Sequence, residues 1–186
     1  MFDVPQFLQL FLQDTFNLLW LGLALFIAGV LEALLWKTSL FKILARPIQS
    51  ELFGENKRWR GLFSLPLATA IAVIFLQLIE ANIGSFSPNF VLFSKFNYLE
   101  YGLLVGFVFN LSELPNSFIK RRLKIPPGDE SSTLFYFVDH MDSTYGVLLL
   151  WYLYFHFPRH LIVTGLVISP LLFMAATWLR KKLGLK

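Results

Sequence analysis

The chain has 186 residues, of which 56% are hydrophobic and 15% charged, and its mean hydropathy is +0.61. One soluble core of this size cannot hide so much apolar sequence, so the composition predicts an integral membrane protein. The absence of cysteine excludes disulfides, thiol catalysis and cysteine-ligated zinc.

The first residues present an apolar face at helical spacing, formed by Phe2, Val4, Phe7, Leu8, Phe11 and Leu12. Two interpretations remain open. The segment is either a short helix lying in the membrane interface or an early start of the first membrane span.

Five stretches approach the roughly 20 apolar residues that a membrane-spanning helix needs. They cover about 15–36, 62–81, 97–115, 138–157 and 161–179. We therefore predict an all-α bundle of five transmembrane helices, forming one domain over residues 1–186. The fourth span is long enough only if it begins near Val138, with Asp139 and Asp142 in its first turn. Pro170 is expected to bend or break the fifth.

Loop charges predict the orientation, because Lys and Arg accumulate on the cytoplasmic side of membrane proteins. With the N-terminus outside and the C-terminus cytoplasmic, 14 of the 16 Lys and Arg residues lie inside, and only Lys95 and Arg159 lie outside. Loops 37–61 and 116–137 then face the cytoplasm. We expect a multi-pass protein of the cytoplasmic membrane. Because its charge follows the topology, no nucleic-acid partner is expected.

Polar residues on the third predicted span suggest a ligand site. Asn110, Glu113 and Asn116 recur every three residues and share one helical flank. They could offer oxygen ligands and hydrogen bonds to a polar ligand. Alternatively, the two asparagines bond across helices while Glu113 pairs with an arginine. Glu80 and Glu100 lie near the outer span ends, where they could simply reach water.

Asp139 and Asp142 are three positions apart at a predicted helix start, so both carboxylates can point to one side. Magnesium is commonly held by one or two carboxylates together with substrate phosphates, which makes this pair a candidate metal site. Helix capping is the structural alternative. His140, between them, is expected to be a hydrogen-bonding neighbour rather than a catalytic group.

Two basic clusters, Lys57–Gly61 and Lys120–Arg122, suit phosphate binding, because arginine forms bidentate contacts and lysine supplies a point charge. Cytoplasmic positive charge and attraction to anionic lipids explain such clusters equally well. For the C-terminal cluster of Arg180, Lys181, Lys182 and Lys186, this ordinary explanation suffices.

These motifs together resemble the CDP-archaeol synthase family and, more distantly, CDP-diacylglycerol synthases. The similarity covers about residues 46–146. It rests on Lys57-Arg58-Trp59-Arg60-Gly61, on the run from Asn116 through Lys120-Arg121-Arg122 to Pro126-Pro127-Gly128, and on Phe137-Val138-Asp139-His140-Met141-Asp142-Ser143. The chain departs from the family pattern at Arg58, Gln49 and Glu113, where Thr, Asp and Asp respectively are usual.

The resemblance implies a membrane cytidylyltransferase that uses CTP and Mg2+ to convert a lipid phosphate to a CDP-lipid and pyrophosphate at the cytoplasmic face. It implies metal binding by Asp139 and Asp142, with Lys120 completing the catalytic set. It also implies contact with the phosphates or the nucleotide by Lys57, Arg60, Glu113, Asn116, Ser117, Arg121 and Arg122.

A non-enzymatic protein that binds or moves anionic lipids is the alternative hypothesis, and it predicts lipid binding without a magnesium requirement. A CDP-alcohol phosphotransferase is disfavoured because its longer Asp- and Gly-containing signature is absent from the sequence. The acceptor lipid and the oligomeric state are not determined by the sequence.

Overall fold

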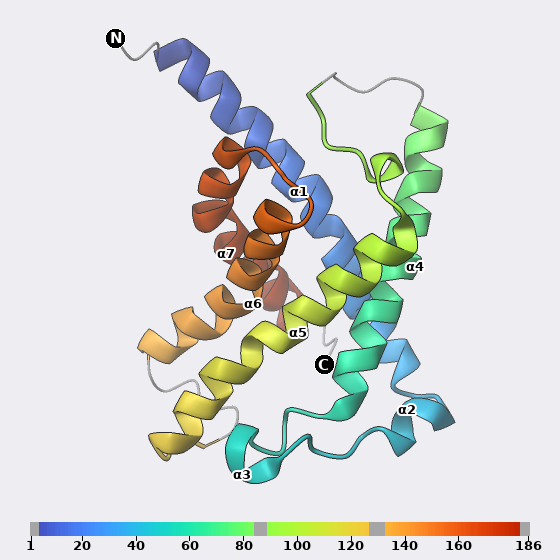
Figure 1. Cartoon of the computed structure of the whole chain (residues 1–186), viewed down its shortest axis with the longest axis vertical. Helices are drawn as coiled ribbons and strands as arrows, with labels where there is room; N and C mark the ends of the chain where they lie inside the picture. The colour runs from blue at the N-terminus through green and yellow to red at the C-terminus, as the bar shows by residue number, and fades with distance from the viewer. Residues whose placement is uncertain (1–3, 84–88, 127–132, 183–186) are drawn as a thin grey trace.

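The structure is a computed structural model that describes residues 4–83, 89–126 and 133–182 (Figure 1). This part of the chain is helical, as predicted, with an isolated β-bridge between Pro47 and Arg58. Its elements are α1 (Val4–Leu35), α2 (Ser39–Ile43), α3 (Ser50–Phe53), α4 (Trp59–Ile83), the 3-10 helix η1 (Phe93–Lys95), α5 (Tyr98–Arg122), α6 (Thr133–Leu153) and α7 (Arg159–Lys182).

Within the described ranges, four helices are long and apolar enough to cross a membrane: α1, α4, α5 and α7. The fourth predicted span corresponds to α6, which does not meet the same criterion because polar residues interrupt its first half. The described part of this membrane protein is therefore built of helices, four of which are candidate spans.

α1 is one continuous helix that includes the N-terminal apolar residues and projects from the bundle in Figure 1. Phe7, Leu8 and Leu12 are exposed on it. The segment is therefore not a separate short helix but the beginning of α1, whose candidate membrane span covers Pro5–Leu35. Phe2 lies outside the described residues.

α4 and α5 cross closely because glycines lie at their contact. A Cβ added to Gly106 would lie 2.6 Å from Pro66 Cα, and one added to Gly102 would collide with the backbone of Ala70. Small residues at such crossings let two membrane helices approach until their backbones nearly touch. The crossing fixes the position of the α5 polar flank relative to the start of α4.

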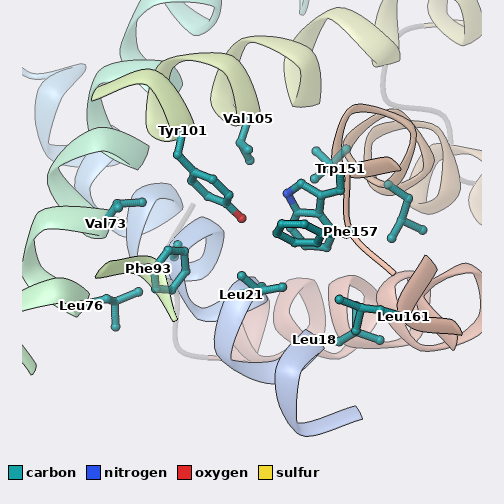
Figure 2. Packing of buried hydrophobic residues seen from close by; sticks show 13 residues of the cluster. Leu18, Leu21, Val73, Leu76, Phe93, Tyr101, Val105, Trp151, Phe157 and Leu161 are labelled. Carbon is teal, nitrogen blue, oxygen red and sulfur yellow. The ribbon is translucent and has the colours of Figure 1, made fainter. Parts of the chain in front are cut away.

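An aromatic cluster fills the core beside η1 (Figure 2). Tyr101 packs edge-on against Phe93 with ring centroids 5.5 Å apart, and Trp151 stacks on Phe157 at 5.3 Å. Such contacts add specific geometry to the burial of large apolar surfaces. The cluster therefore ties η1, α5 and α6 together.

Glu80 anchors the segment that leads from α4 to α5. Its carboxylate is buried and accepts hydrogen bonds from the backbone N–H groups of Phe93 and Ser94, both at 2.7 Å, and from Trp20 Nε1 at 2.8 Å. The expectation that Glu80 simply reaches water is wrong. Its hydrogen bonds replace the water that burial removes.

The segment between α1 and α4 is a shaped element. α2 and α3 lie at the end of the bundle where α5 ends (Figure 1). The chain then doubles back, so that Ile48 N–H donates to Lys57 O at 2.8 Å and Arg60 N–H to Leu44 O at 2.8 Å. Gly54 has a φ of 85°, a conformation that favours glycine. This pairing holds Lys57 next to α5.

Two predicted boundaries need correction, and the predicted break at Pro170 does not occur. α5 continues to Arg122, so Asn116, Ser117 and Lys120 belong to a helix and not to the loop predicted at 116–137. α6 begins at Thr133, so Asp139 and Asp142 lie beyond its first turn. α7 continues across Pro170 without ending there. Pro127 and Gly128 lie outside the described residues.

Candidate active site

Two carboxylates from α6 converge on one amide from α5. Asn116 Nδ2 donates to Asp139 Oδ1 at 2.6 Å and to Asp142 Oδ2 at 2.9 Å. Because the aspartates lie one helical turn apart, both can face α5, as predicted. Helix capping does not explain them, since neither lies in the first turn of α6. The amide holds together two like charges that would otherwise repel each other.

Lys120 completes this group from the next turn of α5. Its ammonium donates to Asp139 Oδ2 at 2.8 Å and to Oδ1 at 3.1 Å, and Lys120 is only 6% exposed. A buried ammonium requires an opposite charge, which Asp139 provides. Asp139, Asp142, Asn116 and Lys120 thus form a compact polar cluster, which we call the carboxylate cluster.

A second pair of contacts extends from the carboxylate cluster toward the start of α4. Ser143 Oγ lies 2.9 Å from Glu113 Oε1 and 3.0 Å from Asp142 Oδ1, and Glu113 Oε2 forms an ion pair with Lys57. The alternative in which Glu113 pairs with an arginine is therefore wrong about the partner, which is Lys57. A continuous line of polar contacts runs from Lys57 to Lys120.

A cavity of about 530 Å³ lies on the Lys57 side of this line. Its polar end includes Lys57, Arg58, Arg60, Glu32 and Glu113. Its remaining wall is mostly apolar and comes largely from α1 and α7, with residues such as Leu18, Leu25, Phe26 and Leu172, while α4, α5 and α6 each contribute a few residues. Asp139 and Asp142 are not among the described residues that line it. The cavity therefore suits an amphiphile with an anionic headgroup.

The α1 wall contains two glycines one heptad apart, Gly22 and Gly29. A Cβ at either position would meet no described atom within 4 Å. The helix therefore presents open space at both points, and a larger side chain there would project into the cavity rather than into a neighbouring helix.

Arg60 lies at the polar end of the cavity. Its guanidinium carbon is 3.9 Å from the ring centroid of Trp36, whose Nε1 donates to Ser64 Oγ at 2.9 Å. Ser64 in turn donates to Glu32 at 2.6 Å. These contacts fix the Arg60 side chain by cation–π attraction, a geometry that lysine would not reproduce.

The other predicted site residues occupy different positions. Asn110 Nδ2 donates to Gly61 O at 2.7 Å, so it bonds across helices. Ser117 is buried on α5, and Arg121 Nε is buried without a partner among the described atoms. Arg122 is exposed and lies over Phe118 at 4.9 Å. The described contacts do not bring Ser117, Arg121 or Arg122 to the carboxylate cluster.

His140 bonds within its own helix, with Nδ1 2.7 Å from Tyr136 O. It is a hydrogen-bonding residue, as predicted, although its partner is a backbone carbonyl. Ser143 and Trp36 were not predicted as site residues. Polar residues in apolar helices were the available signal, and Ser143 directly follows Asp142.

The carboxylate cluster fits a magnesium ion by the chemistry of its donors. Asp139 and Asp142 supply carboxylate oxygens, and Asn116 Oδ1 is buried without a hydrogen-bond partner among the described atoms. Oxygen donors of this kind suit Mg2+ when substrate phosphates complete its coordination. No group of three or more His, Cys, Asp or Glu able to hold a metal occurs in the described ranges. Phosphate oxygens would therefore be needed.

Comparison with known proteins gives one consistent result. A family model described as CarS-like CDP-archaeol synthase matches residues 16–186. The CDP-archaeol synthase of Pyrococcus furiosus is 34% identical over 142 residues, covering 73% of each chain. That of Pyrococcus horikoshii is 32% identical over 141 residues, covering 73% of this chain and 72% of the relative. No solved structure matches this chain.

The membrane helices, the cationic cavity and these matches define a membrane-embedded enzyme of lipid biosynthesis. The chain belongs to the CDP-archaeol synthase family, a family of CTP-dependent cytidylyltransferases. This confirms the resemblance and the enzyme class inferred from the motifs. It leaves the non-enzymatic lipid-binding hypothesis without support.

Proposed function

We propose that the protein transfers CMP from CTP to a lipid phosphate in the presence of Mg2+, producing a CDP-lipid and pyrophosphate at the cytoplasmic membrane face. The single observation that best supports this is the continuous line of polar contacts from Lys57, at the cavity, to Lys120, in the carboxylate cluster. The contacts join a cavity with a cationic, polar end to a cluster whose oxygen donors would suit a metal ion.

The cavity is the proposed site of the lipid phosphate. Its wall along α1 begins near Leu18 and continues to Glu32, and Trp36 follows just beyond the end of the helix, beside Arg60. At 1.5 Å per residue, Leu18 to Glu32 spans roughly 21 Å, about two-thirds of the thickness of the hydrocarbon core of a membrane. The lipid chains would lie along this wall while the phosphate meets Lys57 and Arg60.

The carboxylate cluster is the proposed site of the metal and nucleotide. Asp139 and Asp142 would hold Mg2+, with Asn116 orienting both carboxylates. When bound, the ion would supply positive charge to the triphosphate and so reduce its repulsion of the incoming lipid phosphate. Lys120 lies close enough to contact the same phosphates. We assign Ser117, Arg121 and Arg122 to the nucleotide side by family resemblance alone.

The reaction forms a bond between a lipid-phosphate oxygen and the α-phosphorus of CTP, while the bond from that phosphorus to the bridging oxygen breaks. The electron pair leaves with pyrophosphate. Because two anions must approach each other, the side chains contribute charge neutralisation and alignment. Lys57 and Arg60 would orient the acceptor, and Lys120 would orient the triphosphate.

The orientation follows from the charge distribution. Lys57, Arg60 and Lys120 belong to segments that carry most of the basic residues, and such segments face the cytoplasm, where CTP is found. We propose that α6 also crosses the membrane, with Asp139, Asp142 and Ser143 facing α5 rather than lipid. Polar residues inside membranes usually turn toward the bundle in this way.

The test is incubation of the purified protein with CTP labelled at the α-phosphate, Mg2+ and a panel of lipid phosphates that differ in their chains. We expect label in a CDP-lipid, and no label transfer when Mg2+ is chelated. Label in the lipid without any divalent ion would contradict the metal role. Failure with every lipid phosphate would contradict the activity.

A further inference from the structure

Ser143 occupies the junction between the cavity and the carboxylate cluster. It is fully buried at 0% exposure, and it comes from α6, whereas Glu113 comes from α5 and Lys57 from the segment before α4. Its hydroxyl lies at hydrogen-bond distance from two carboxylates, Glu113 and Asp142. Both distances, 2.9 and 3.0 Å, are suitable for a full hydrogen bond.

A serine hydroxyl has one hydrogen, so it can fully satisfy only one of these two acceptors at a time. Because Ser143 is buried, bulk water does not supply a hydrogen bond to the other carboxylate. Which carboxylate accepts the Ser143 hydrogen depends on the other hydrogen-bond partners of each. Glu113 has Lys57, and Asp142 has Asn116 Nδ2 at 2.9 Å and the backbone N–H of Ser143 at 2.6 Å.

We propose that Ser143 is a positioning residue that couples binding of the acceptor phosphate at Lys57 to binding of the divalent ion at Asp142. This rests on the proposed function of the two half-sites. When a phosphate draws Lys57 away, Glu113 loses its cationic partner and takes the Ser143 hydrogen. Asp142 Oδ1 then has one hydrogen-bond donor fewer and becomes a better metal ligand.

The coupling is positive and reciprocal, because a change that the phosphate makes in metal affinity must equal the change that the metal makes in phosphate affinity. The expected factor is about tenfold, which corresponds to the lower end of the contribution of a single hydrogen bond to a charged group. This arrangement would favour binding of the ion when an acceptor lipid is already present.

The experiment measures Mn2+ binding by the loss of its free electron paramagnetic resonance signal. A CTP analogue with a methylene group between the α- and β-phosphorus is present, so that triphosphate oxygens are available to the ion but no turnover occurs. The acceptor probe is a short-chain dialkylglycerol phosphate, and Mn2+ bound to the analogue or the probe without protein is subtracted. We expect the Mn2+ dissociation constant of the intact protein to fall about tenfold at a saturating probe concentration. An unchanged constant, with both ligands bound, would overturn the inference.

Variants at position 143 test whether the Ser143 hydroxyl is responsible for the coupling. Ser143→Ala should bind Mn2+ with an affinity that the probe changes less than about twofold, whereas Ser143→Thr, which keeps the hydroxyl, should retain the coupling. Thr69→Val is the control, because Thr69 is buried in α4, its Oγ1 donates to Leu65 O of the same helix at 2.7 Å, and it is not among the described residues that line the cavity. Loss of coupling in this control, or retention in Ser143→Ala, would contradict the assignment.

CDP-lipid formation with CTP and Mg2+ is measured on the same preparations. If the intact protein makes CDP-lipid but shows no coupling, the role of Ser143 is wrong and the proposed function stands. If it binds Mn2+ and the probe with the expected coupling but makes no CDP-lipid, the proposed activity is wrong and the coupling stands.

Discussion

Removal of the Asn116 amide gives the sharpest test of how the two aspartates are held. Nδ2 donates to Asp139 at 2.6 Å and to Asp142 at 2.9 Å, so Asn116→Ala removes two hydrogen bonds to charged groups. Each such bond is worth roughly 1.5–3 kcal/mol. The two carboxylates also lose the group between them, so their mutual repulsion increases and they separate.

Loss of an orienting group of this kind lowers metal affinity by about 10- to 100-fold, or roughly 1.4–2.8 kcal/mol. Cytidylyl transfer by Asn116→Ala should therefore need about 10- to 100-fold more Mg2+ for half-maximal rate. The assay is the initial rate of CDP-lipid formation over a range of Mg2+ concentrations at fixed CTP.

Asn110→Ala is the matched control, since Asn110 lies on the same helix and donates to Gly61 O at 2.7 Å without contacting a carboxylate. Its Mg2+ requirement should remain that of the unaltered protein. An unchanged requirement in Asn116→Ala, or an equal change in both variants, would refute the view that Asn116 organises a metal site.

Three further predictions test the two half-sites and the scaffold. Lys57→Met should raise the KM for the acceptor lipid roughly tenfold and leave the KM for CTP unchanged. Initial rates with each substrate varied in turn measure both constants. Equal changes in the two KM values would contradict the division into a lipid half-site and a nucleotide half-site. Gly29→Leu should reduce turnover of a long-chain acceptor lipid roughly tenfold more than turnover of a short-chain one, because the leucine side chain would enter the open space of the cavity. Equal losses for the two lipids would contradict the proposal that the lipid chains lie along the α1 wall. Glu80→Gln should lower the free energy of unfolding by about 1–3 kcal/mol, because it weakens the hydrogen bonds to the backbone of Phe93 and Ser94. The variant should show a lower Tm and an unchanged kcat at low temperature. An unchanged Tm would refute the scaffold role of Glu80.

Periodicity predicted the parts of the fold that depend on local sequence. The apolar stretches located every long helix, and the three-residue spacing of Asp139 and Asp142 correctly predicted that both face one neighbour. Boundaries were less accurate because residues 116–122 and 133–137, which were predicted as loop, are also helical. Hydropathy detects burial in lipid and does not detect a helix that ends or begins outside it.

The contacts that join the half-sites were not predictable from one sequence. Lys57 and Glu113 are 56 positions apart, and their pairing depends on the antiparallel contact that places Lys57 beside α5. Ser143 links two carboxylates only because α5 and α6 pack at this level. Spacing along one helix can be read locally, whereas contacts between helices depend on packing.

Metal-directed oxidative cleavage tests the central claim most directly, because it locates the ion. Fe2+ replaces Mg2+ in the presence of CTP, ascorbate and peroxide generate hydroxyl radicals at the bound iron, and mass spectrometry identifies the cut sites. We expect cuts on α5 near Asn116 and on α6 between Asp139 and Asp142, and we expect excess Mg2+ or the change Asp142→Asn to abolish them. Cuts elsewhere in the bundle, or cuts that persist in Asp142→Asn, would contradict the assignment of the metal to this pair of carboxylates.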